Sequence, residues 1–181
     1  MSYSSSSSSC SSSAYETVTF TKEDIDLFRE RLIRLMDERE LPDLSELDYY
    51  KVYALEESWL GFRHWSIVLA KDRIYFTLEL TVSKTGGKQE NHMRSVILDD
   101  SKIEKLIYKG EVLDTGMDLI NKAIKVFETF GKYLIVSNNC QKYCNLVLSE
   151  FGLGDKADWT DTQKGLVGAA VMTGAALCRI A

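Results

Sequence analysis

Cys140 stands where a short polar stretch gives way to a helical pattern, in the segment SNNCQKYCNLVLSEFGLG. The first turn of a helix carries unpaired backbone N–H groups and a partial positive charge. A thiol placed there forms its thiolate more readily, and the same N–H groups can bind the oxyanion that develops when a carbonyl is attacked. The position indicates a nucleophilic cysteine, and the alternative is a small apolar residue that begins a buried helix face.

A nucleophilic thiol needs a general base, and the chain contains two histidines, His64 and His92. His92 lies in the polar segment GGKQENHMRS, which we interpret as an exposed turn. His64 opens the apolar segment HWSIVLA, which is typical of a strand, and Trp65 follows it. A histidine at the start of a strand can face the N-terminus of a helix packed on the sheet. We therefore predict that His64 takes and returns the proton of Cys140, and the alternative is a histidine bonded to backbone.

A third polar group usually holds the imidazole of such a pair in place. If residues 71 and 72 form a hairpin turn, the following strand brings residues 76–80 opposite His64. Side chains alternate along a strand, so Thr77 and Glu79 share one face. Either side chain could orient the imidazole, because a register slip of one residue would exchange the two faces.

Four segments between residues 47 and 98 are rich in aromatic and β-branched residues, which predicts four antiparallel strands. Residues 102–114 fit either a further short strand or a turn of helix. Amphipathic helices are predicted in TFTKEDIDLFRERLIRLMDERELP, in DTGMDLINKAIKVFETFGK and from Cys140 onward, with Asn138 or Asn139 as the last helix's cap. The fold class is therefore α+β, with an antiparallel sheet packed against the cysteine helix. The buried face of that helix is predicted to consist of Cys140, Tyr143, Cys144, Val147, Leu148 and Phe151.

The chain has 181 residues and a net charge of −5, which fits one domain and argues against nucleic acid as a partner. Residues 1–14 are mostly serine and are predicted to be a disordered tail, and residues 15–160 to form the domain. Residues 161–181 hold an apolar stretch rich in Gly and Ala. This stretch is either a lipid-associating tail or a helix that packs on the domain or on a partner.

The four cysteines form no dense disulfide framework, and the serine-rich start does not resemble a secretory signal. We therefore expect a reducing, cytoplasmic location, with membrane association through the tail as an addition. No CxxC pair occurs, and TGGK lacks the preceding glycine of a phosphate-binding loop. Neither a cofactor nor a metal is therefore expected.

The segment RHWSIVLAKDRIYFTLEL, followed much later by NNCQKYCNLVL, resembles the lecithin:retinol acyltransferase-like branch of the NlpC/P60 superfamily. Members of that branch have a circularly permuted papain-like fold, in which the histidine strand precedes the cysteine helix. The family's H-W strand start matches His64 and Trp65, and its N-C-E-H-F motif falls on residues 139–143. The resemblance covers residues 45–155, and several members also use a hydrophobic tail as a membrane anchor.

This resemblance implies an acyl-enzyme at Cys140, with His64 as its base and a lipid or another acyl-bearing small molecule as its substrate. Asn139, Gln141 and Trp65 match the motifs beside the two reacting residues. They are therefore candidates for supporting the oxyanion and the site.

Two positions differ from the family pattern. The family's second histidine would fall near Phe76 or Thr77, and its Glu-His pair is Gln141–Lys142 here. The first difference leaves the partner of the imidazole open, and losing that partner can cost orders of magnitude in rate. A non-catalytic binding domain descended from such an enzyme is therefore an alternative.

The same segments are also similar to the PPPDE-type deubiquitinating and desumoylating peptidases. That family shares the permuted fold, the order of histidine and cysteine, and an N-C-N-x-F motif that resembles residues 139–143. Both families use the same two residues, so the two resemblances imply one site with two classes of substrate.

Overall fold

The computed structural model describes residues 18–21, 25–38, 43–59, 62–85, 88–98, 100–135 and 137–154. The predictions for residues 1–14 and 161–181 concern segments outside these ranges. Within these ranges, the structure contains no helix with the length and apolar character needed to cross a membrane.

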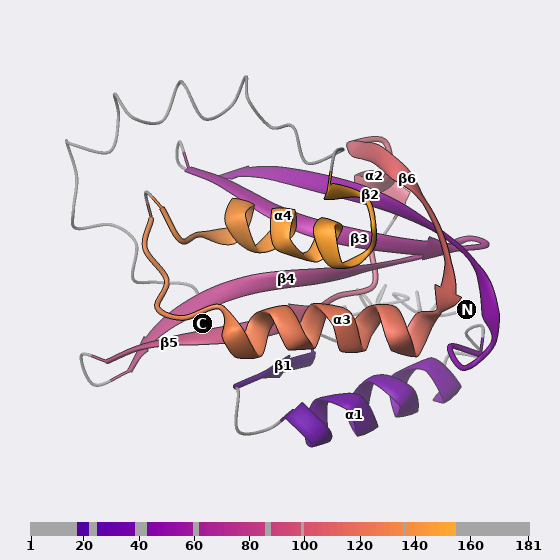
Figure 1. The fold of residues 1–181 in the computed structure, drawn as a ribbon, viewed down its shortest axis with the longest axis horizontal. Helices are drawn as coiled ribbons and strands as arrows, with labels where there is room; N and C mark the ends of the chain where they lie inside the picture. The colour runs from indigo at the N-terminus through magenta and orange to yellow at the C-terminus, as the bar shows by residue number, and fades with distance from the viewer. Residues whose placement is uncertain are drawn as a thin grey trace, which may run out of the picture.

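A six-stranded antiparallel sheet forms the centre of the protein, in the order β1-β5-β4-β3-β2-β6 (Figure 1). The four predicted strands are confirmed as β2 to β5, which follow one another both along the chain and in the sheet. The segment that fitted either a strand or a helical turn contains both, a short helix α2 and the edge strand β6. The bounds are β1 (Val18–Phe20), β2 (Leu47–Trp59), β3 (Phe62–Lys71), β4 (Ile74–Thr85), β5 (Lys88–Ser95), α2 (Asp100–Ile103) and β6 (Leu106–Thr115).

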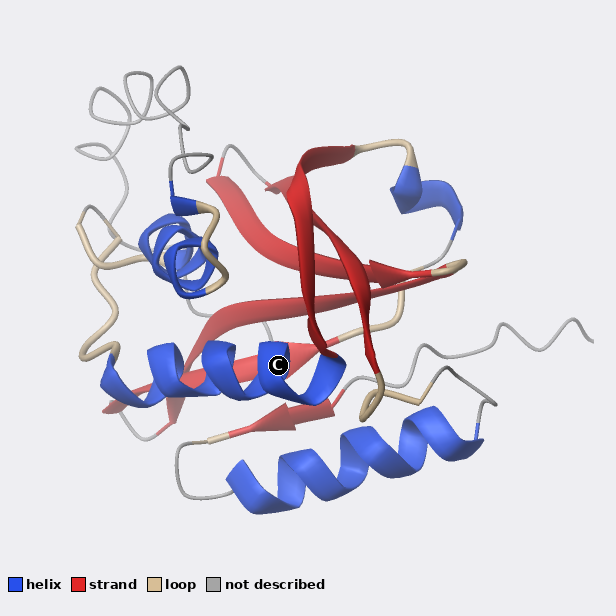
Figure 2. Cartoon of the chain, turned by 45° about the vertical axis from the view of Figure 1, so that its right-hand side comes forward, coloured by secondary structure: helices blue, strands red, loops and turns tan. Residues whose placement is uncertain are grey.

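Three longer helices accompany the sheet: α1 (Ile25–Glu38), α3 (Gly116–Thr129) and α4 (Cys140–Glu150). The helices α3 and α4 lie next to each other against the sheet, and α1 packs beside β1 (Figures 1 and 2). The α+β class is therefore confirmed, and so is the packing of the cysteine helix on the sheet. We call the face that α3 and α4 cover the inner face and the opposite one the outer face.

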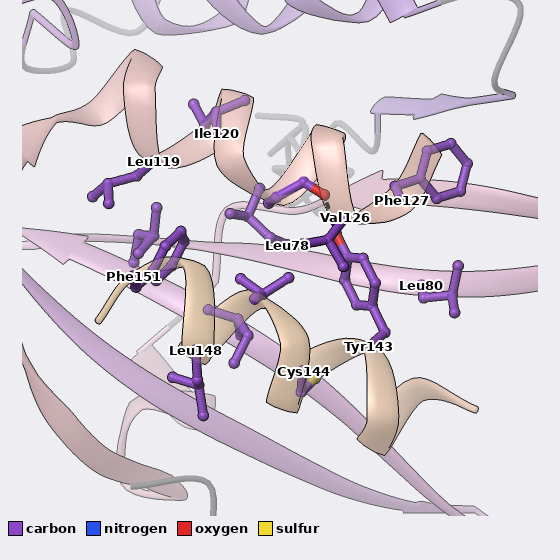
Figure 3. Packing of buried hydrophobic residues seen from close by; sticks show 14 of the residues in the cluster. Leu78, Leu80, Leu119, Ile120, Val126, Phe127, Tyr143, Cys144, Leu148 and Phe151 are labelled. Carbon is purple, nitrogen blue, oxygen red and sulfur yellow. Dashed lines mark hydrogen bonds between the residues drawn. The ribbon is translucent and has the colours of Figure 1, made fainter. Parts of the chain in front are cut away.

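Side chains of the central strands alternate between these two faces. The inner-face side chains form one core with α3 and α4, and they are mostly fully buried (Figure 3). Their neighbours along β3 and β4 point to the outer face, and these include His64, Thr77 and Glu79. The inner-face residues of the two strands are Trp65, Ile67, Leu69, Phe76, Leu78 and Leu80.

The helix α4 begins at Cys140 because Asn139 caps it. The Asn139 side chain accepts a hydrogen bond from the backbone N–H of Lys142 at 3.2 Å, which satisfies one of the unpaired donors of the first turn. All six residues of the predicted buried face are buried. Among them, Tyr143 donates a hydrogen bond to the carbonyl oxygen of Ala123 at 3.2 Å and so ties α4 to α3 (Figure 3).

Two local predictions were wrong. The hairpin turn between β3 and β4 consists of residues 72 and 73, because Lys71 is already paired with Ile74. His92 lies within β5 rather than in a turn, and its ring is half-buried, with Nε2 at 2.7 Å from the hydroxyl of Ser83. The polar composition of β5 did not indicate a strand, because its polar side chains find their partners outside β5. His92 and Arg94 bond to Ser83 and Glu79 of β4.

Candidate active site

The candidate site forms where β3 and β4 separate. Their pairing ends at Ile67 and Leu78. Beyond this point β3 stays paired with β2 as far as Phe62, while β4 is paired with β5 from Glu79 onward. The first residues of β3 therefore present an edge that no strand in the described ranges covers, and α4 packs against β3 and β4 beside it.

Cys140 occupies this opening, with 3% of its surface exposed. Its sulfur accepts a hydrogen bond from the backbone N–H of Trp65 and lies 4.0 Å from the carbonyl oxygen of Arg63. The phenol of Tyr133 reaches the same sulfur at 4.0 Å, and the imidazole of His64 is hydrogen-bonded to it. The sulfur thus faces donors from Trp65, His64 and Tyr133, and the carbonyl oxygen of Arg63 can accept from the thiol.

His64 lies between this sulfur and a buried carboxylate. Its Nε2 is 2.8 Å from Oε2 of Glu79, whose surface is 2% exposed. Since Nε2 is engaged with Glu79, Nδ1 is the ring nitrogen left to interact with Cys140. The predicted base is therefore held between the predicted nucleophile and one of its two predicted orienting partners.

Three side chains hold the carboxylate of Glu79. Oε2 accepts hydrogen bonds from His64 and from Nη2 of Arg94 at 2.9 Å, and Oε1 accepts one from the hydroxyl of Thr77 at 3.2 Å. The Thr77 hydroxyl in turn accepts from the backbone N–H of Val96 at 3.0 Å. The two predicted orienting residues thus act in sequence, with Glu79 on the imidazole and Thr77 on Glu79.

These contacts set the charges of the site. Burial by itself would raise the pKa of Glu79, but the hydrogen bonds from His64 and Arg94 lower it to about 2. Burial by itself would lower the pKa of His64, but its hydrogen bonds to Cys140 and Glu79 raise it to about 10. Burial opposes ionisation of Cys140, yet the interaction with His64 leaves the pKa of the thiol below its ordinary value. Both shifts favour a thiolate beside an imidazolium over a neutral thiol beside a neutral imidazole.

The phenol of Tyr133 stays protonated in this environment. Burial, followed by the neighbouring charge of Cys140, raises the pKa of Tyr133. A neutral phenol can donate to a thiolate or to an oxyanion formed next to it. Tyr133 is therefore a fixed donor on the side of the sulfur that faces the loop.

The remaining predicted residues contribute in other ways. Trp65 acts through its backbone N–H, while its ring is buried in the core. Asn139 caps α4 and donates a hydrogen bond from its side chain to the carbonyl oxygen of Ile135 at 2.8 Å. Gln141 is buried in the first turn of α4. Within the described part of the chain, neither the Asn139 nor the Gln141 side chain is hydrogen-bonded to Cys140 or His64.

Sequence reasoning missed Tyr133 and Arg94. No sequence pattern pointed to Tyr133, because its contact with the sulfur of Cys140 depends on the conformation of the loop between α3 and α4. Arg94 had a sequence signal: the sequence TGGK is typical of a two-residue hairpin loop, which would fix the register of the strands on either side of it. That register places Arg94 directly opposite Glu79.

Comparisons with known proteins found no matching family model, no matching curated relative and no matching solved structure. Within the described ranges, no group of three or more His, Cys, Asp or Glu residues is placed to hold a metal ion.

Proposed function

We propose that this protein is a cysteine-nucleophile enzyme that transfers or hydrolyses acyl groups through an acyl-enzyme at Cys140. We further propose that its sheet and cysteine helix form a circularly permuted papain-like fold, as in the lecithin:retinol acyltransferase-like proteins. The observation that carries the proposal is the hydrogen-bonded series from Cys140 through His64 to Glu79. A nucleophile, a base and an orienting carboxylate are the parts that such chemistry requires.

In the proposed first step, the thiolate of Cys140 attacks the carbonyl carbon of the substrate, and a C–S bond forms. The π electrons of the carbonyl move to its oxygen, where the backbone N–H groups at the start of α4 and the phenol of Tyr133 can donate to it. When the carbonyl re-forms, the bond to the leaving group breaks. The imidazolium of His64 gives its Nδ1 proton to that group and becomes neutral.

In the second step, water or an amine attacks the thioester while neutral His64 removes its proton at Nδ1. The tetrahedral intermediate then expels the thiolate of Cys140, which restores the starting ion pair. Glu79 keeps the ring in the tautomer that this step needs, because its carboxylate accepts the proton on Nε2.

A lipid-type acyl chain is the substrate class that we propose. Its support, besides the resemblance, is the loop before α4, in which Leu134 and Ile135 follow Tyr133 and expose 50% and 42% of their surface. Hydrogen bonds between the backbones of Leu134 and Asn138 hold this loop in shape beside the sulfur. Large apolar side chains exposed next to a reactive thiol offer a contact for a hydrocarbon chain.

The test compares the rate at which iodoacetamide alkylates Cys140, followed by peptide mass mapping, in the wild type, His64→Ala and His92→Ala. We expect fast alkylation at neutral pH in the wild type and in His92→Ala, whose histidine lies elsewhere in the sheet. His64→Ala should react as slowly as an ordinary thiol. Equal rates in all three proteins would contradict the proposal.

A second assay addresses the substrate. Incubation with 4-nitrophenyl esters of two to ten carbons should add the acyl mass to Cys140, with faster acylation by the longer chains. Cys140→Ala should not be acylated. Release of a fluorophore from the C-terminus of a ubiquitin-like protein, without acylation by the esters, would instead favour the peptidase activity of the second family.

A further inference from the structure

We propose that Arg94 is a positioning residue that keeps Glu79 an anion while His64 is neutral, and that it thereby supports the breakdown of the acyl-enzyme. This inference rests on the proposed function. It starts from the position of Arg94, which lies directly opposite Glu79 on β5 and donates to the same oxygen, Oε2, that binds His64. The cation and the imidazole thus share one acceptor atom.

The need for a second cation follows from the reaction cycle. Before acylation, Glu79 faces an imidazolium, and the two opposite charges stabilise each other. After His64 has protonated the leaving group, its ring is neutral. Without Arg94, the nearly fully buried carboxylate of Glu79 would then have no charged partner. Burial of an uncompensated carboxylate raises its pKa and favours its neutral form.

Protonation of Glu79 would then misplace the ring proton. A carboxylic acid would donate to Nε2, so the neutral ring would carry its proton on Nδ1. A ring protonated at Nδ1 cannot accept a proton from the attacking water. Arg94 stays protonated throughout, and because it lies 2.9 Å from Glu79 it keeps the carboxylate anionic in the second step as well.

Two acidic side chains of β2 already have cationic partners of their own. Glu57, directly opposite His64 on β2, receives a hydrogen bond from Lys102 of α2 at 2.8 Å. Glu56 forms an ion pair with Arg63 at 3.0 Å. Glu57 also acts on Arg94 and, like Glu79, raises the pKa of its guanidinium, against the effect of burial. Among the described residues, Arg94 and His64 are the cationic groups hydrogen-bonded to Glu79.

The experiment uses the full chain and 4-nitrophenyl acetate, which separates a burst of nitrophenol from the slower steady state. We expect Arg94→Gln, which retains a hydrogen-bond donor but removes the charge, to keep the burst. Its steady-state rate should fall on the order of tenfold or more, because the ring loses its correct tautomer. Arg94→Lys, which restores the charge, should recover most of that loss. Arg29→Met removes an arginine of α1 that bonds to Asp26 on the same helix and to Asn121 on α3, and it should change neither phase.

A double-mutant comparison separates this role from a general effect on folding. If Arg94 acts through Glu79, then Glu79→Gln and the double variant Glu79→Gln with Arg94→Gln should have equal steady-state rates. Unchanged deacylation in Arg94→Gln, or a further loss in the double variant, would overturn the inference. In either case a burst in the wild type would leave the proposed function standing. The absence of a burst and of acylated Cys140 in the wild type would contradict the proposed function itself.

Discussion

His64 and Cys140 belong to opposite faces of one sheet and meet where that sheet opens. Cys140 is part of the inner core together with Trp65, and the alternation along β3 places His64 on the outer face. The two side chains interact because β3 is not paired with β4 before Ile67, and β4 is not paired with β3 after Leu78.

Glu79→Gln should separate the orienting charge from the shape of the site. The amide has nearly the same size, but the imidazole loses its anionic partner, so the pKa of His64 should fall from about 10. Steady-state ester hydrolysis should drop about 10²- to 10⁴-fold, and its alkaline limb should move to lower pH. The measurement is the rate of nitrophenol release as a function of pH. An alkaline limb at the wild-type position would argue against a role for Glu79 in holding the imidazolium.

Tyr133→Phe should weaken both the thiolate and the oxyanion. Removing the phenol takes away one donor to the sulfur of Cys140, so the pKa of the thiol should rise. The acylation rate should fall by about tenfold or more, as expected for the loss of one donor to a developing oxyanion. Tyr75→Phe is the matched control, because that ring lies on β4 against Tyr53 of β2. Identical acylation rates in the two variants would exclude Tyr133 from the reaction.

Substitutions at Asn139 should separate helix capping from thiol acidity. Asn139→Ala removes the cap of α4 and should lower the free energy of unfolding by about 1 kcal/mol. Asn139→Asp keeps a capping oxygen but adds a negative charge next to Cys140, so it should raise the pKa of the thiol without that loss of stability. Urea unfolding and the pH dependence of alkylation measure the two effects. A thiol titration in Asn139→Asp equal to that of the wild type would show that the added charge does not reach the sulfur.

The dependence of stability on pH should reveal the ion pair. Relative to the unfolded chain, the pKa of Glu79 is lowered from 4.5 to about 2, so its contribution is present above about 4.5 and is lost as the pH falls toward 2. His64 is raised from 6.5 to about 10, so its contribution is present below 6.5 and is lost as the pH rises toward 10. Cys140 is lowered from 9.0, so its contribution is present above 9.0 and is lost as the pH falls.

The effects of His64 and Cys140 on stability oppose each other between pH 6.5 and 9.0. In this window folding favours a proton on the imidazole, whose pKa is raised, and disfavours one on the thiol, whose pKa is lowered. Cys140→Ala removes this balance while Glu79 still raises the pKa of His64. Its stability relative to the wild type should therefore fall with rising pH, by at most about 1.4 kcal/mol per pH unit. Urea unfolding at several pH values measures this difference, and parallel curves would contradict the ion pair.

The sequence predicted the parts of the site that depend on local pattern. The helical periodicity after Cys140 and the capping position of Asn139 are visible in a single segment, and both are confirmed. The choice between Thr77 and Glu79 could not be made, because it depends on how far β3 and β4 stay paired. The extent of this pairing is linked to the packing of α4 against the two strands, and a local sequence pattern cannot predict contacts between segments so far apart in the chain.

The register also explains why the error in the position of the β3–β4 turn did not change the predicted partners of His64. Moving the hairpin turn to residues 72 and 73 shifts the partner of each β3 residue, yet Glu79 still lies diagonally across from His64. The misplacement of His92 had another cause. Its strand is held by polar side chains on a half-exposed face, so apolar alternation, the usual signal of a strand, is weak there.

The sulfur of Cys140 draws its partners from β3, from the loop at Tyr133 and, through His64 and Glu79, from β4 and β5. In chain order α4 follows every one of these segments. A ribosome therefore synthesises the thiol only after all the groups that lower its pKa, and we expect the thiol to keep ordinary reactivity until α4 docks. Acquisition of fast alkylation at this one cysteine would mark the moment at which the domain completes its folding.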